Sequence, residues 1–136
     1  MAIETWDPTQ PAKTNDGYAI DDVFLQRIID FMTTQKNHDV RSFLSAEDQQ
    51  YHQPIILQPK EEWFAKKSLL STDDIIALIR FFTLAEMQYN HWRAEERSPV
   101  IWLTKILRQK GGKIDKDLLL WIKTESDNKF LPNGAL

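Results

Sequence analysis

The chain has 136 residues, a net charge of −3 at pH 7, 42% hydrophobic residues and no cysteine. This length favours one domain with a sizeable core, and the lack of Cys excludes disulfides, a thiolate nucleophile and Cys-ligated metals. The acidic balance disfavours general binding to nucleic acids or membrane surfaces. Residues 1–7 lack the basic and apolar regions of a signal peptide, so we expect a cytoplasmic location and no membrane association.

The chain begins with a segment that has no helical period. Pro8, Pro11 and Gly17 interrupt it, and these residue types favour extended or turning backbone. We therefore expect an extended N-terminal arm over residues 1–20. A single helical domain is expected to follow over residues 21–136.

The first helix is predicted to begin at Asp21 and Asp22, because carboxylates are favourable at the positive end of the helix dipole. Apolar residues then recur with the spacing of one helix face. These residues are Phe24, Ile28, Phe31 and Met32.

The next part of the chain carries weaker signals. The pattern before Pro54 is ambiguous. It is compatible with a short helix that contains Val40, Phe43 and Leu44 and with another that Ser45 caps, and Pro54 ends any helix before it. Residues 55–57 form an apolar run between two prolines with no obvious strand partner, so we expect an extended connector packed on the core. A short helix is predicted over residues 60–67, with Pro59 at its first position.

Residues 75–85 form the most apolar stretch, in which Arg80 and Thr83 are the two polar residues. The run is too short for a membrane span, which needs about 20 apolar residues. A helix that is apolar on nearly all sides must be enclosed. We therefore predict the central helix of the domain, capped by Ser71 or Thr72, or a helix partly covered by a second subunit.

Two further helices are predicted near the C-terminus. Ser98 and Pro99 form a helix start, and Gly111 and Gly112 form a helix stop. A last helix over residues 116–124 and an irregular tail follow. All four glycines fall in predicted connectors. Together the patterns predict an all-α fold, a compact bundle of four to five helices with an irregular N-terminal arm and C-terminal tail.

No residue cluster predicts catalysis or cofactor binding. The acidic pairs mostly fall at predicted helix starts, where the dipole explains them. His91 and Glu95 have the i, i+4 spacing of metal ligands, but no second pair such as an HExxH motif accompanies them. Gly111 and Gly112 end a helix, whereas a phosphate-binding loop opens one. We expect no metal, no cofactor and no enzyme activity.

A basic segment over residues 105–116 is the strongest candidate for binding. Its helix–glycine turn–helix setting, residues 98–124, matches the outline of a helix-turn-helix motif and makes nucleic-acid binding an alternative. The second helix is mostly apolar, however, and begins with aspartates that phosphate would repel, so an acidic protein partner is favoured. The basic residues expected to contact that partner are Lys105, Arg108, Lys110 and Lys113.

Trp102 and Trp121 complete this candidate surface. Both lie in apolar runs longer than one core stripe requires, and Trp is enriched among interface anchors, although core packing also explains them. We predict a small non-catalytic helical interaction or regulatory protein that docks a protein partner, with a second copy of the chain as one candidate. A small-molecule pocket lined by the tryptophans is a further alternative.

Overall fold

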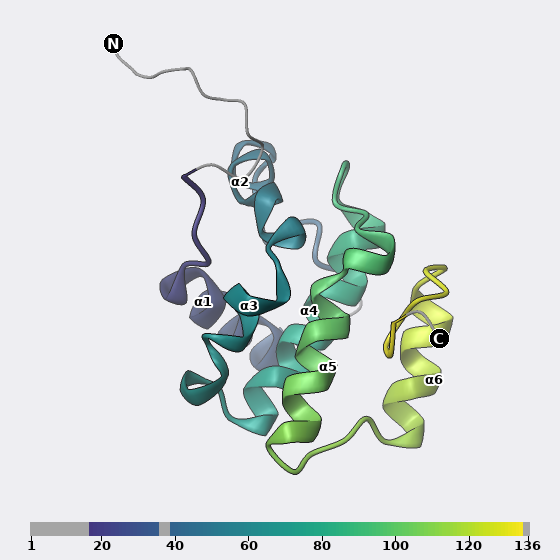
Figure 1. Ribbon diagram of the computed structural model, residues 1–136. Helices are drawn as coiled ribbons and strands as arrows, with labels where there is room; N and C mark the ends of the chain where they lie inside the picture. Colours follow the sequence, from purple (N-terminus) through teal and green to yellow (C-terminus); the bar gives the residue numbers. More distant parts are fainter. Residues whose placement is uncertain (1–16, 36–38, 135–136) are drawn as a thin grey trace.

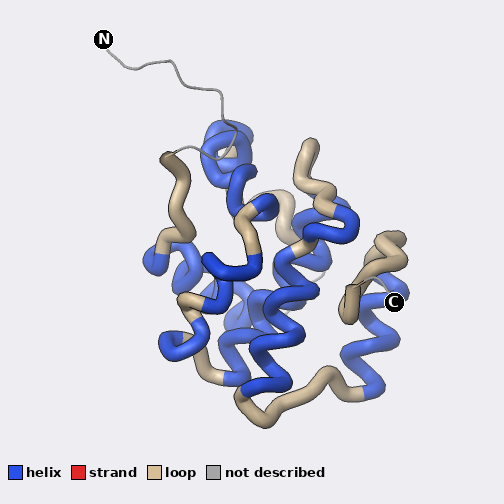
Figure 2. The backbone as a smooth tube through the Cα atoms, viewed as in Figure 1, coloured by secondary structure: helices blue, strands red, loops and turns tan. Residues whose placement is uncertain are grey.

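The computed structural model describes residues 17–35 and 39–134. Over these residues the chain forms helices, turns and loops without a strand (Figure 1, Figure 2), which confirms the all-α class. The described residues contain six α-helices, so the predicted count of four to five is too low. Two short helices between the first helix and the central one bring the number to six. None of the helices in these ranges combines the length and apolarity needed to cross a lipid bilayer.

The α-helices in chain order are α1 (Asp22–Gln35), α2 (Ala46–His52), α3 (Lys60–Phe64), α4 (Thr72–Gln88), α5 (Pro99–Gln109) and α6 (Lys116–Glu125). Three 3-10 helices lie in the connections, η1 (Gln53–Leu57), η2 (Lys67–Leu69) and η3 (Glu95–Arg97). The helix α3 ends short of the predicted residue 67, and η2 follows it.

Side-chain caps determine where the helices begin. Ser71 accepts a hydrogen bond from the Asp74 backbone N–H at 3.0 Å, and the Asp74 carboxylate accepts one from the Ser71 N–H at 3.0 Å. This capping box selects Ser71 from the two predicted cap residues of α4. Ser45, Ser98 and Asp115 cap α2, α5 and α6 by accepting a hydrogen bond from a nearby backbone N–H.

The helix α4 is the central element, as its apolar run predicts. It packs against α1, α5 and α6, and the side chains of Ile75, Ile79 and Phe82 are fully buried. Phe82 meets Trp63 of α3 edge to face, with 5.6 Å between the ring centroids. Helices of the same chain therefore supply most of the cover that this apolar helix needs.

The extended connector predicted for residues 55–57 is wrong, because these residues belong to η1. Ile55 and Ile56 are fully buried, so their backbone polar groups need partners within the chain, and a helical turn supplies them. Pro54 fits this first turn because it has no N–H that would need a partner there. The sequence prediction used this proline only as a helix terminator.

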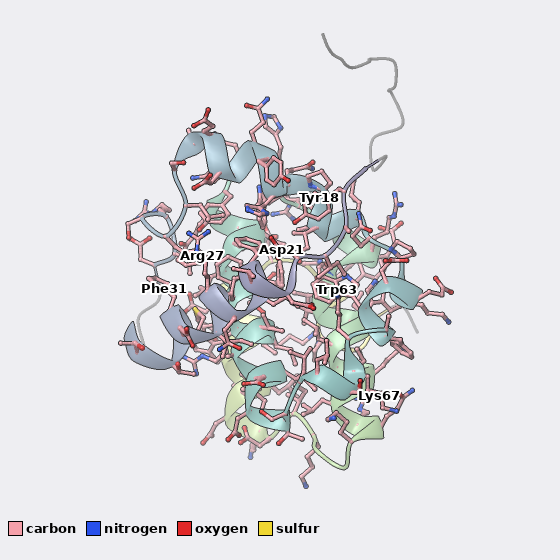
Figure 3. The ribbon with its side chains drawn as sticks, turned by 90° about the vertical axis from the view of Figure 1, so that its left-hand side faces the viewer. Tyr18, Asp21, Arg27, Phe31, Trp63 and Lys67 are labelled. Atoms are coloured by element: carbon pink, nitrogen blue, oxygen red, sulfur yellow. The ribbon has the colours of Figure 1, made fainter. Side chains whose placement is uncertain are left out.

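The described part of the predicted N-terminal arm, residues 17–20, packs on the helices, whereas residues 1–16 lie outside the described residues. The hydroxyl of Tyr18 lies 3.1 Å from Nδ1 of His52 at the end of α2. The His52 ring stacks on Phe24 of α1, with 3.6 Å between the centroids. Figure 3 shows Tyr18 and Asp21 near the start of α1, with Phe31 farther along the helix. These ring contacts join α1 to α2.

The C-terminal tail folds back toward α5 and the loop that precedes it. The Asn128 amide donates a hydrogen bond to the Glu95 carbonyl oxygen at 3.0 Å, and Leu131 is buried. Arg108 of α5 donates a hydrogen bond to the Asn133 side chain. The irregular tail that the sequence predicts is therefore a packed part of the domain up to the last described residues.

Replacing the fully buried Phe82 by Ala tests the central position of α4. Removal of a buried aromatic ring loses its transfer free energy and leaves a cavity, so we expect the free energy of unfolding to fall by about 3–5 kcal/mol. Urea denaturation followed by circular dichroism measures the change. Leu69→Ala, at a side chain that is 62% exposed, is the control and should change stability by about 0.5 kcal/mol or less. Equal effects of the two substitutions would contradict the assignment.

Candidate docking groove

Two adjoining hollows lie along one face of α4. One, of about 360 Å³, is lined by α4, α6 and the connector before α6. The other, of about 340 Å³, is lined by α1 and α4. Ile76 and Arg80 line both hollows, so the two form one surface, which we call the α4 groove. Its lining residues are Met32, Thr33, Asp73, Ile76, Ala77, Arg80, Lys113, Asp115, Asp117, Leu118 and Trp121.

The floor of the α4 groove is one face of the central helix. Asp73, Ile76, Ala77 and Arg80 follow the spacing i, i+3, i+4, i+7, which places them in one row on a helix. Ile76 and Arg80 are half-buried, unlike most residues of α4. The helix α6 packs on α4 less extensively than α5 does, and this leaves the row partly open.

Arg80 lies at the centre of the groove and stacks on an aromatic wall. Its guanidinium carbon lies 4.8 Å from the ring centroid of Trp121 on α6, a cation–π contact. Arg80 forms no hydrogen bond and no ion pair with any described residue. The ring thus contacts the guanidinium, while no described residue accepts a hydrogen bond from its N–H donors. A planar guanidinium in this condition is suited to two parallel hydrogen bonds with a carboxylate.

Acidic side chains border the groove at the end where α4 and α6 begin, near the lower edge of the molecule in Figure 1. Asp73 lies in the first turn of α4, and Asp117 lies in the first turn of α6. The carboxylate of Asp115 is already engaged, because it accepts the Leu118 N–H at 2.8 Å. Lys113 is the cation at this end. The groove thus combines an apolar floor, a cationic centre and a mainly acidic end.

The predicted basic residues lie in different places. Lys113 lines the α4 groove. The Lys110 ammonium donates a hydrogen bond to the Lys67 carbonyl oxygen at 3.0 Å, and Arg108 donates one to the C-terminal tail. Lys105 is exposed on α5. Of the four residues expected to contact a partner, Lys113 is therefore the one that the structure brings to the groove.

The two tryptophans of the predicted surface are separated. Trp121 lines the α4 groove, whereas Trp102 lies on α5 and packs on the core as a half-buried ring. The indole Nε1 of Trp102 is buried and has no hydrogen-bond partner among the described residues. Trp102 therefore lies outside the α4 groove, whereas Trp121 is part of it.

The sequence prediction missed Arg80 and Ile76 as site residues, although a signal for Arg80 exists. Arg80 is the only charged residue between residues 75 and 85. A charge in an otherwise enclosed helix must reach water or a partner group, because burying it alone is costly. The sequence therefore shows that Arg80 must reach water or a partner group. It does not show that α6 brings Trp121 to Arg80, because that contact depends on tertiary packing.

A separate hollow, of about 470 Å³, lies outside the α4 groove, between α2 and the turn after α4. Amide side chains line it, and they include Gln49 and Gln53. Both amides are engaged by the chain itself, because Gln53 donates to the His91 carbonyl oxygen at 2.9 Å and Gln49 donates to the Leu44 carbonyl oxygen at 3.1 Å. This hollow is larger than either part of the α4 groove but offers less specific chemistry to a partner.

The residues with metal-ligand spacing do not share a helix. The helix α4 ends before His91, and both His91 and Glu95 have positive φ angles, 68° and 51°. The i, i+4 geometry that motivated the comparison with metal ligands therefore does not exist here. Within residues 17–35 and 39–134, no group of three or more acidic or histidine side chains is placed to hold a metal ion.

A buried carboxyl group lies at the C-terminal end of α4. Glu86 is 3% exposed and accepts a hydrogen bond from the fully buried Ser98 hydroxyl at 2.5 Å. Burial raises the pKa of Glu86 to about 8, although Ser98, the Ala94 backbone N–H and the charge of Arg93 act in the opposite direction. Glu95 adds a smaller upward contribution to this pKa. Because Glu86 and Ser98 are out of reach of a substrate, we assign them a structural role.

Comparison of the chain with protein-family models, with curated proteins and with solved structures found no match. The functional interpretation therefore depends on the residues and the geometry of this chain.

The raised pKa of Glu86 predicts how stability depends on pH. The folded protein keeps a proton that the unfolded chain releases above about pH 4.5, so the free energy of unfolding should fall as pH rises from about 4.5 to 8. The slope from this group reaches at most about 1.4 kcal/mol per pH unit and vanishes above pH 8. Glu86→Gln should flatten the profile and be more stable than the wild type above pH 8. Urea titrations across this range provide the measurement.

The exposed Glu61→Gln is the matched control for this experiment, because it removes the same charge from the surface. Its stability profile should run parallel to that of the wild type. A Glu86→Gln profile that also stays parallel would show that Glu86 is ionised in the folded protein at neutral pH.

Proposed function

We propose that this protein is a small non-catalytic interaction protein that docks a helical segment of a partner protein in the α4 groove. The observation that carries the proposal is Arg80, a half-buried cation that stacks on Trp121 and has no polar partner among the described residues. A guanidinium that contacts an aromatic ring and has no polar partner among the described residues is suited to bind a group of another molecule.

The residue types of the groove support a protein partner. Arg, Trp and Met are enriched in the cores of protein–protein interfaces, and the groove contains Arg80, Trp121 and Met32. Ile76 on its floor and Leu118 on α6 offer apolar contacts. A long, shallow groove between helices is the usual site for the apolar face of an amphipathic helix, whose contact residues recur at i, i+3, i+4 and i+7.

Nucleic-acid binding through residues 98–124 is the alternative, and the placement of the cations favours it less. Lys110 and Arg108 are engaged by other parts of the chain. The start of α6, which would have to enter a groove of the nucleic acid, carries Asp115 and Asp117. Their charges oppose the approach of phosphates.

Selection from a displayed library of amphipathic helical peptides tests the proposal. Wild-type protein should enrich peptides that bind it with micromolar or tighter affinity. Leu118→Asp places a charge in the groove and should weaken their binding by about tenfold or more. Leu120→Asp makes the same change on the same helix at a side chain that is 57% exposed and outside the groove, and binding should persist. Failure to enrich any peptide, or equal effects of both variants, would contradict docking in the groove.

A mobility-shift assay with DNA and RNA at about 150 mM salt separates the two functions. We expect no sub-micromolar binding. Tight binding that falls steeply with salt and is lost in an Arg108→Glu, Lys110→Glu variant would favour the nucleic-acid alternative, because each phosphate contact releases counterions.

A further inference from the structure

The charges of the α4 groove indicate which charged residues a bound partner helix carries. We propose that the occupant is an amphipathic helix whose apolar face carries one Asp or Glu that pairs with Arg80, with a Lys or Arg seven positions away that faces Asp73. This inference depends on the proposed function and adds the chemistry of the bound segment.

The carboxylate follows from the surroundings of Arg80. The guanidinium carbon lies over the Trp121 ring, and no described residue accepts a hydrogen bond from the N–H groups. Two carboxylate oxygens match the N–H edge of a guanidinium. Docking of an apolar helix would remove water from Arg80. A cation that loses its hydration without a partner is costly, so an apolar helix that lacks an acidic residue at this point would bind poorly. The need to pair Arg80 therefore discriminates against partner helices that lack a carboxylate at this position.

The basic residue follows from the row of α4 side chains. Asp73 and Arg80 are seven residues apart on one helix, which corresponds to about 10 Å along its axis. A partner helix that lies along α4 has the same rise per residue, so the two oppositely charged residues that face this pair are also seven positions apart. The spacing holds for both directions of the partner helix. At the acidic end the partner cation faces Asp73 and Asp117, with Lys113 nearby on the connector.

The α4 groove itself gives a reason to expect these charges in a partner rather than within the chain. Asp73, Asp115 and Asp117 all line the groove with Arg80, yet none of them forms an ion pair with it. The cation and the carboxylates are held apart on α4 and at the start of α6. The opposite charges on one helix face thus form a pattern that a complementary helix can match in one register.

Charge exchange between protein and peptide tests the pairing with Arg80. Peptides selected on the full-length wild-type chain should share one acidic position on their apolar face, and replacing that residue by Lys should weaken binding by about tenfold or more. Selection on Arg80→Glu should yield Lys or Arg at the same position. The Lys peptide should bind Arg80→Glu more tightly than it binds the wild type. Arg27→Glu, which makes the same charge change at an exposed position outside the groove, should leave the wild-type selection unchanged.

Asp73→Lys tests the seven-residue spacing in the same way. Peptides selected on this variant should carry Asp or Glu, instead of Lys or Arg, at the position seven residues from the one that pairs with Arg80. Thermal melting of each variant should show a folded protein. Neither Arg80 nor Asp73 forms a hydrogen bond or an ion pair with a described residue, and Asp73 contributes to the fold through its position in the first turn of α4.

The outcomes separate this inference from the proposed function. If peptides bind in a manner sensitive to Leu118→Asp but show no acidic preference, and Arg80→Glu does not alter the selection, the charge pairing is wrong while docking in the groove stands. If sedimentation of the wild type alone shows a dimer that Leu118→Asp dissociates, the occupant is a second copy and the inference is overturned. If no peptide depends on the groove, both proposals fail.

Discussion

The enclosure of α4 is the constraint on which the other helices depend. Its apolar residues extend around most of the helix, and an isolated helix of this kind would expose more apolar surface than water tolerates. The chain meets this constraint by packing α1, α5 and α6 against it, while Trp63 of α3 reaches Phe82.

Arg80 is the one charged residue in the apolar run 75–85 and explains the character of the open face. A guanidinium cannot be enclosed without a partner, so the side of α4 that carries it cannot be covered as completely as the others. The Trp121 ring contacts the Arg80 guanidinium, and no described residue accepts a hydrogen bond from the guanidinium N–H groups. Arg80 lines both parts of the α4 groove on this side of the helix. Arg80 therefore affects both how completely α4 can be covered and which partner the α4 groove can bind.

At the other end of α4, polar groups determine how the last third of the chain returns to the bundle. Glu86 joins the end of α4 to Ser98, the residue that caps α5. Asn128 of the tail binds the carbonyl oxygen of Glu95 in the same loop. These contacts fix the turn between the two helices that pack most extensively on each other. A buried carboxyl is retained there because its hydrogen bonds are satisfied within the chain.

The sequence by itself determined the local features of this protein. Ser71, Ser98 and Asp115 act as helix caps because a cap needs only residues two or three positions apart. The apolar run identified α4 because its burial is a property of composition. The helical turn at Ile55 and Ile56 was not predictable, since its cause is the burial of backbone groups that only the packed structure reveals. The groove depended even more on tertiary structure. Lys113 and Trp121 were identified as candidates, but their association with Arg80 requires α6 to return alongside α4, and long-range packing rather than local spacing decides that position.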